Sequence, residues 1–308
     1  MAAQGRMKTA PQPPDISVIL PAFNRAASVR DAMDSVLAQT GPSLELIVVD
    51  DASTDATARV AETHPDPRIR LIRLPENRGV SAARNAGIAA ARAEWVAFQD
   101  SDDLWLPGKL AAQIAAARPG DVAVYCALRI EDPEGLSQHG SRITPGPDVQ
   151  PREGALLPAL LRANFVSTQT LMVRRAVLER LGGFDTSLQA LVDWELMLRL
   201  APLGPVSFVP EAYAVQRFSE NSLTRSQSRR AAARTAILSR HADLFATRPA
   251  AHAFQLYTAA GEARRMGDLN AARRHLAAAR RARPLWWRPH AMGLWLALRR
   301  LQGIRRAT

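Results

Sequence analysis

The stretch "LELIVVDDASTDATARVAETHPDPRIRLIRL", Leu44 to Leu74, decides the fold. Its first eight residues contain the apolar run "LIVV" and its last seven place Ile and Leu between arginines, so both ends are predicted to be strands. "DATARVAETH" between them is predicted to be a helix. Two strands joined through a helix indicate a parallel pair with a crossover connection.

The same alternation continues on both sides of this stretch. "ISVILP", Ile16 to Pro21, is an expected strand and residues 26–40 an expected helix; further on, residues 79–93 are an expected helix and "EWVAFQD", Glu94 to Asp100, a strand. The sequence therefore predicts an α/β fold, Rossmann-like, with a mostly parallel sheet and helices on both faces. In such sheets ligands bind beyond the carboxyl ends of the strands.

Length and composition exclude several classes of protein. The chain has 308 residues, enough for one large core or two domains, and no apolar run reaches the roughly 20 residues of a membrane-spanning helix. The N-terminus lacks the apolar segment of a secretory signal, and Cys126 is the single cysteine. We expect a buried thiol, no internal disulfide and a cytoplasmic protein.

The chain is expected to divide into three parts. Residues 1–14 are predicted to be a disordered lead-in, 15–224 an α/β domain whose segment from Ile130 to Arg152 forms loops, and 225–308 a helical region. The last part carries 18 arginines against 3 acids and includes a tetratricopeptide-like helix pair, Leu256 to Pro284. One such pair cannot bury its own apolar face, so it packs on the preceding domain or on a partner.

Three predicted strands end in polar clusters: "PAFN", "DDAST" and "DSDD". In the last cluster Asp100, Asp102 and Asp103 lie within four residues and repel one another unless they are solvated or share a cation. Mg²⁺ and Mn²⁺ bind oxygen ligands and are often held by one or two carboxylates together with substrate phosphates. The cluster is a candidate site for a divalent cation, although Asp-x-Asp triplets are common in loops.

A further acidic cluster, "DWE", begins a predicted helix at Asp193 to Glu195. Side chains two apart on a helix point to different faces, so only one of these acids can serve a given site as general base. The alternative is that both acids stabilise the positive end of the helix dipole.

Taken in order, "SVILPAFNR", "LIVVDDASTDAT", "NRGVSAARNAGIAAARAEWVAFQDSDDLW", "GGFD" and "DWELMLRL" resemble family 2 glycosyltransferases. These are inverting enzymes with the A-type nucleotide-sugar-binding fold, GT-A, and the resemblance covers Ile16 to Thr224. It implies transfer of a sugar from a nucleotide-diphosphate donor, with a UDP-sugar expected, to a saccharide or lipid-linked acceptor. Synthesis of cell-surface polysaccharide or glycolipid is the implied setting.

The resemblance also implies a role for individual residues. Asp193 matches the catalytic base and Glu195 a supporting residue. The implied donor-site residues are Pro21, Ala22, Phe23, Asn24, Asp51 at the nucleotide base, Arg84 near the diphosphate and Asp102 at the ribose. The implied metal ligands are Asp103, as the direct one, with Asp102 and Asp100. Trp194 and Trp105 either line the sugar or acceptor site or pack in the core.

One position departs from the family pattern: Ser219 stands at or near the place of a histidine that many relatives carry, which puts a third protein ligand for the metal in doubt. Two other functions stay open. One is a metal-dependent nucleotidyltransferase. The other is a non-catalytic binding or scaffold protein that uses its basic tail.

The C-terminal segment "PLWWRPHAMGLWLALRRLQGIRR" combines Trp286, Trp287 and Trp295 with leucines and arginines. This composition is typical of an amphipathic helix on an anionic membrane, and equally of a helix that packs on the catalytic domain. We expect no nucleic-acid partner.

Overall fold

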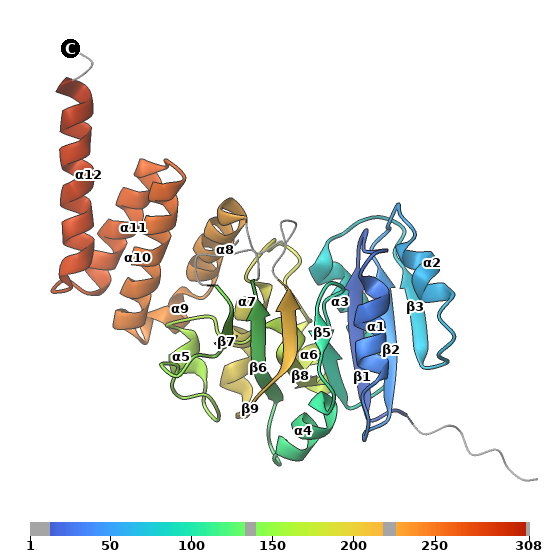
Figure 1. The fold of residues 1–308 in the computed structure, drawn as a ribbon. Coiled ribbons are helices and arrows are strands. Elements are labelled where there is room, and N and C mark those ends of the chain that lie inside the picture. The colour runs from blue at the N-terminus through green and yellow to red at the C-terminus, as the bar shows by residue number, and fades with distance from the viewer. Residues whose placement is uncertain (1–12, 133–139, 218–225, 306–308) are drawn as a thin grey trace, which may run out of the picture.

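The computed structural model describes residues 13–132, 140–217 and 226–305. Strands β1 (Ile16–Ala22), β2 (Leu44–Asp50), β3 (Ile69–Arg73) and β4 (Trp95–Phe98) are parallel neighbours, as predicted. Helices α1 (Val29–Leu37), α2 (Thr57–Glu62) and α3 (Val80–Ala90) connect them (Figure 1). The expectations for residues 1–12 and for Ser219 fall outside the described residues.

The second half of the sheet is mixed. Antiparallel to β4 lies β8 (Leu171–Arg174), followed by β6 (Ala123–Glu131), β9 (Val206–Arg217) and β5 (Leu104–Trp105), in the order β3-β2-β1-β4-β8-β6-β9-β5. A short strand, β7 (Arg142–Thr144), pairs with β6 inside the segment predicted to be loops. The buried Cys126 lies in β6, as expected.

Helices cover both faces of the sheet, which confirms the predicted layers. One core joins α3, α6 (Arg175–Leu181) and α7 (Val192–Leu200) to one face; the other joins α1, α2 and α4 (Lys109–Ala116) to the opposite face. The alternation of strand side chains separates them: Ile47 and Val49 belong to the first core, Leu46 and Val48 to the second. The short helix α5 (Leu157–Leu160) also contacts α7.

The C-terminal region is helical, as predicted: α8 (Gln227–Arg240), α9 (Ala242–Ala246), α10 (Pro249–Arg265), α11 (Leu269–Ala282) and α12 (Trp287–Arg305). These helices extend away from the sheet, with α12 farthest from it (Figure 1). The pair α10/α11 turns at Gly267 and is capped by Asp268, whose side chain accepts a hydrogen bond from the Ala271 N–H. No helix within the described ranges has both the length and the hydropathy to cross a membrane.

Helices α8 to α10 pack on the α/β part of the chain. Phe245 of α9 is fully buried and meets the ring of Trp194 edge to face at 6.2 Å. Gln255 of α10 donates from Nε2 to the carbonyl oxygens of Leu161 and Arg162 at 3.3 and 2.7 Å. The helix pair therefore packs on the preceding domain, the first of the two expected arrangements.

Candidate active site

The predicted nucleotide wall follows β1. Pro21 and Ala22 are buried at the end of the strand, whereas Phe23 is 41% exposed. Asn24 has a φ of +51°, in the left-handed region that asparagine tolerates. Its backbone N–H and its side-chain Oδ1 each make a 2.9 Å hydrogen bond with residues 53–54. The loops after β1 and β2 are thus tied into one unit with Phe23 at its surface.

Asp51 is 2% exposed and braces a third loop. Its two carboxylate oxygens accept the backbone N–H groups of Arg78 at 2.9 Å and of Gly79 at 2.8 Å. Hydrogen bonds to a carboxylate are stronger than those between neutral groups. The side chain implied to contact the nucleotide base therefore also fixes the chain where it enters α3.

Arg84, on α3, forms an ion pair with the acidic cluster after β4. Its guanidinium is 5% exposed, donates from Nη2 to Asp100 Oδ1 at 2.5 Å, and lies 5.2 Å from the centroid of the Phe184 ring. Its Nε is buried and no described residue accepts a hydrogen bond from it. Burial raises the pKa of both Asp102 and Asp193, and the charge of Arg84 is among the smaller effects that oppose it.

The three clustered acids point to different partners. Asp103 is 3% exposed and its Oδ2 accepts from Gln169 Nε2 at 2.9 Å. Burial, followed by the charges of Asp100 and Asp102, raises its pKa well above the usual range. The described residues contain no group of three or more acidic, histidine or cysteine side chains arranged to hold a metal ion.

Asp102 instead faces a surface hollow of about 460 Å³. Its side chain is 39% exposed, and its Oδ2 lies 3.8 Å from Arg25 Nη2. Burial and the neighbouring Asp100 raise the pKa of Asp102, and Arg25 lowers it by less. Asp55 and Arg217 also line the hollow, so carboxylates and guanidinium groups meet there. Such a surface can bind an anion and a cation together.

Asp193 has one oxygen held and one free. Oδ1 accepts from Asn164 Nδ2 at 3.0 Å and from the Trp194 N–H at 2.8 Å, whereas Oδ2 accepts from no described residue. Burial raises the pKa of this carboxyl, and the same hydrogen bonds and the charges of Arg84 and Arg230 offset that effect only in part. A fixed carboxylate with a free oxygen and a raised pKa suits a general base.

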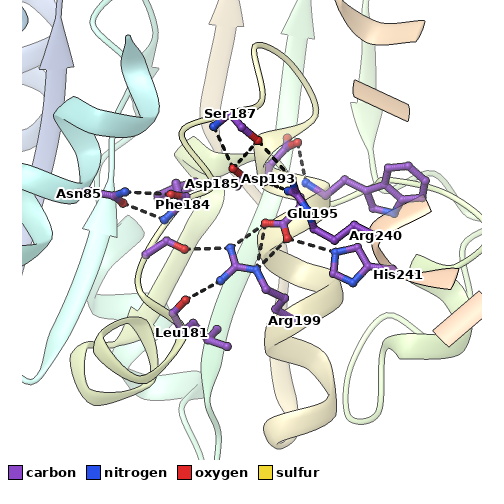
Figure 2. A network of polar contacts seen from close by, with 12 residues as sticks. Asn85, Leu181, Phe184, Asp185, Ser187, Asp193, Glu195, Arg199, Arg240 and His241 are labelled. Carbon is purple, nitrogen blue, oxygen red and sulfur yellow. Dashed lines mark hydrogen bonds and ion pairs between the residues drawn. The ribbon is translucent and has the colours of Figure 1, made fainter. Parts of the chain in front are cut away.

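Glu195, two residues further on, has a different environment (Figure 2). It is 1% exposed and pairs with Arg199, Nη2 to Oε2 at 2.7 Å, and with His241, Nε2 to Oε1 at 3.1 Å. Burial would raise its pKa, but the hydrogen bonds from His241 and Arg199 outweigh burial and lower it. Arg199 also donates to the carbonyl oxygens of Leu181 and Gly183 at 2.8 Å. Glu195 therefore joins α7 to the turn after α6 and to the end of α8.

The two tryptophans pack in the core, one of the two alternatives drawn from the sequence. Trp194 is fully buried and donates from Nε1 to Leu160 O at 2.7 Å. Trp105 is 3% exposed and donates from Nε1 to Gln169 O at 3.1 Å. Neither ring has the exposed surface that an acceptor sugar would need.

Several site residues escaped sequence reasoning. Arg25, Asn164 and Gln169 contact the predicted acids, but no local pattern marks them. Asn85 could have been found from the sequence, because it is a polar residue beside Arg84 on a predicted helix. Its amide exchanges hydrogen bonds of 2.7 and 2.8 Å with the backbone of Phe184. The preceding residue, Gly183, has a φ of +73°, and a Cβ there would lie 2.3 Å from Asn85 Oδ1, so glycine is required.

Comparison with known proteins identifies the family of this chain. The family model "Glycosyl transferase family 2" matches residues 17–182, from β1 to the end of α6. The chain belongs to glycosyltransferase family 2. Residues 24–28, Asp55 and Asp102 of the hollow lie within the match, whereas Arg217 lies outside it. Its fold is GT-A-like, followed by the C-terminal helices.

Three relatives show the extent of the similarity. The chain is 34% identical over 221 residues to the succinoglycan biosynthesis protein ExoO of Rhizobium meliloti (strain 1021), a match that covers 69% of this chain and 63% of that protein. It is 42% identical over 103 residues to the putative teichuronic acid biosynthesis glycosyltransferase TuaG of Bacillus subtilis (strain 168), covering 33% and 41%. An uncharacterized protein of Mycobacterium tuberculosis (strain CDC 1551 / Oshkosh) is 32% identical, covering 67% and 68%.

Among solved structures, the mannosyltransferase PcManGT from Pyrobaculum calidifontis, in complex with GDP-Man and Mn²⁺, has a TM-score of 0.61 and 26% identity. The match covers 96% of this family 2 chain and 84% of the mannosyltransferase chain. S. aureus TarS 1–349, in complex with UDP-GlcNAc, has a TM-score of 0.60 over 89% and 93% of the two chains. Its identity of 17% shows the fold alone.

Proposed function

We propose that this chain transfers a sugar, with inversion, from a nucleotide-diphosphate donor to an acceptor hydroxyl. The observation that carries the proposal is the geometry of Asp193, whose Oδ1 is held by Asn164 and the Trp194 N–H while Oδ2, which accepts from no described residue, can take a proton. Asp102 lines the hollow, and Arg84 pairs with Asp100 of the same acidic cluster. The donor bound by PcManGT, GDP-Man, supports the donor class.

The hollow is the proposed donor site. Phe23, which is 41% exposed and precedes the lining residue Asn24 in the chain, offers an aromatic face on which a nucleobase can stack. Arg25 and Arg217 offer guanidinium groups to the diphosphate. The side chain of Asp51 holds the loop at residues 78–79 in place for this site.

The carboxylate oxygens of Asp102 are suitable ligands for a divalent cation. The side chain of Asp102 is 39% exposed, so a cation can reach it. Partial burial and the charge of Asp100 raise its pKa, because they disfavour the ionised carboxylate, and a bound cation would offset that cost. Bound there, Mg²⁺ or Mn²⁺ would supply Lewis-acid stabilisation of negative charge on the diphosphate. Asp103 was expected to be the direct ligand, but its burial and its bond to Gln169 support Asp102 in that role. Asp100, paired with Arg84, is the supporting acid.

The reaction is a single displacement. The acceptor oxygen forms a bond to the anomeric carbon as the bond from that carbon to the phosphate oxygen breaks, and the bonding electron pair leaves with the diphosphate. Oδ2 of Asp193 takes the acceptor proton, while Asn164 and the Trp194 N–H hold Oδ1. Arg84 stabilises the leaving charge by charge-assisted hydrogen bonds. Attack from the face opposite the leaving group gives inversion.

The acceptor is proposed to be a saccharide or a lipid-linked saccharide in the synthesis of a surface polysaccharide or glycolipid, with the enzyme in the cytoplasm. The roles of ExoO in succinoglycan synthesis and of TuaG in teichuronic acid synthesis support this setting. Family membership favours glycosyl transfer over the nucleotidyltransferase and scaffold alternatives. The released product distinguishes the two enzymatic functions. Glycosyl transfer releases a nucleoside diphosphate, whereas nucleotidyl transfer releases pyrophosphate.

The test is a melting-temperature panel with UDP, GDP, dTDP and CMP, each with and without Mn²⁺. A ligand that binds only the folded state at about 100 times its Kd adds about 2.7 kcal/mol of stability. We expect one nucleoside diphosphate, with UDP first, to raise the melting temperature more with Mn²⁺ than without it. The Asp102→Asn variant should lose the metal-dependent part, and Asp148→Asn, at an exposed acid outside the hollow, should keep it. No metal-dependent rise with any nucleotide would overturn the proposal.

A further inference from the structure

We propose that α12, with the residues that lead into it, is an interfacial surface that docks the chain on an anionic lipid bilayer. The docking surface consists of five apolar side chains and three arginines: Phe254, Leu285, Trp287, Leu294 and Leu298, with Arg281, Arg283 and Arg288. This inference is independent of the proposed function, because it rests on exposure and charge at the opposite end of the chain from the donor hollow.

Helix α12 has two apolar faces, and one of them is exposed. Met292 and Leu296 point inward and pack with the small residues of α10 and α11. Trp287, Leu294 and Leu298 are spaced by seven and four residues, so they recur on one side of the helix. Their exposed fractions are 68%, 63% and 50%. A helix that only closed the core would place polar residues at these positions.

An aromatic cluster extends the surface at the start of α12. Leu285 is 97% exposed. Trp286 packs on Tyr257 with ring centroids 5.1 Å apart, and on Phe254 at 6.4 Å. Phe254 is itself 45% exposed. The apolar surface is therefore held by ring packing on α10, and α12 lies at the end of the molecule that is farthest from the sheet (Figure 1).

The charge around this surface has one sign. The sequence has no Asp or Glu after Asp268 but ten arginines. Arg281, Arg283 and Arg288 are exposed and lie on both sides of Leu285 and Trp287 along the chain. Tryptophan and leucine flanked by arginine are typical of helices that lie in the plane of a membrane interface. Anionic headgroups supply the complementary charge.

Two other occupants fit this surface less well. A second copy of the chain would bring the same arginines against each other, and like charges repel. A nucleic acid would bind the arginines, but it would leave Trp287, Leu294 and Leu298 exposed to water. A bilayer with anionic lipid accepts the apolar side chains and the cations together, which is why we choose it.

The test is flotation of the full chain with vesicles of phosphatidylcholine, with and without phosphatidylglycerol. We expect binding to the anionic vesicles only, and weaker binding as salt rises. Because each arginine near an anionic surface contributes about fivefold to binding, replacing Arg281, Arg283 and Arg288 by Gln should weaken it about a hundredfold. Replacing Trp287, Leu294 and Leu298 by Ser should abolish flotation. Ile143→Ser, at an exposed residue of β7, is the matched control and should float like the parent chain.

A second measurement needs no multiple variant. Lipids brominated along the acyl chain should quench the tryptophan fluorescence of the parent chain, and Trp287→Phe should lose part of the quenching. Absence of binding to anionic vesicles at low salt would overturn the proposal. So would unchanged flotation of both triple variants, or a dimer in solution that the Ser variant dissociates. DNA binding without vesicle binding would assign the surface to nucleic acid instead.

Discussion

The donor side and the base side of the candidate site are held in different ways. Loops after β1, β2 and β3 brace one another directly, as when Asp51 accepts the N–H groups of residues 78–79. On the base side, Asn164 of the α/β part holds Asp193, and residues of the C-terminal region add further contacts. His241 pairs with Glu195, and the charge of Arg230 on α8 acts on the pKa of Asp193. The C-terminal helices therefore contribute contacts to the helix that carries the base, whereas the residues that line the donor hollow all come from the α/β part.

Asp193→Asn should give the largest effect. The amide keeps the shape of the carboxylate but cannot take a proton, so kcat should fall by about 10² to 10⁴. The melting-temperature rise caused by nucleotide and Mn²⁺ should be retained, because the donor hollow is built from other loops. Turnover and thermal shift are measured on the same preparation. Full turnover in this variant would remove Asp193 as the base.

Arg199→Met is expected to damage the base side through stability. Glu195 would remain buried without its arginine, and breaking a buried pair costs about 3 to 5 kcal/mol. Urea unfolding should show that loss, and kcat should fall because Glu195 shares its turn of helix with Asp193. The control is Arg118→Met in the exposed pair Arg118–Glu153, where we expect about 0.5 kcal/mol or less. Equal losses in the two variants would contradict the role given to Glu195.

The Glu195 cluster also has a pH signature. Its pKa is lowered in the folded chain, so its contribution to stability is present above the ordinary glutamate pKa and is lost as pH falls through the folded value. Part of the stability difference between the parent chain and Arg199→Met should therefore disappear in acid.

On the donor side, Asp51→Asn should cost about 2 kcal/mol. The amide has one acceptor oxygen where the carboxylate has two, so one of the two backbone N–H groups at residues 78–79 loses its partner. We expect a smaller nucleotide-induced rise in melting temperature and a higher KM for the donor, with kcat largely kept. A fall in kcat at saturating donor that matches the fall in kcat/KM would show that the two sides are not separable.

The prediction with the smallest effect at neutral pH concerns the pH profile of kcat, on its acid side. Since burial raises the pKa of Asp193, the base becomes protonated at a pH above the ordinary aspartate value of about 3.9. The kcat profile should therefore fall with decreasing pH before an ordinary aspartate would titrate. A profile that stays flat down to pH 4 would contradict the raised pKa.

Much of the fold was predictable because its signals are local. Apolar strands, helical spacing and the polar residues that end each strand depend on neighbours along the chain, and β1 to β4 with α1 to α3 lie where these patterns place them. Parallel strands carry their carboxyl ends to one edge of the sheet, so the sequence also brought Asn24, Asp51 and Asp102 to the same region. The geometry of a helix separated Asp193 from Glu195.

Only the tertiary structure decided what each acid does. Asp100, Asp102 and Asp103 are neighbours in one loop, yet their carboxylates meet Arg84, Arg25 and Gln169, which come from different elements. Glu195 could be paired with Arg199 from helical spacing, but not with His241. These partners are brought together by packing across the sheet and against the C-terminal helices. No periodicity records such contacts, because they depend on where distant segments lie in space.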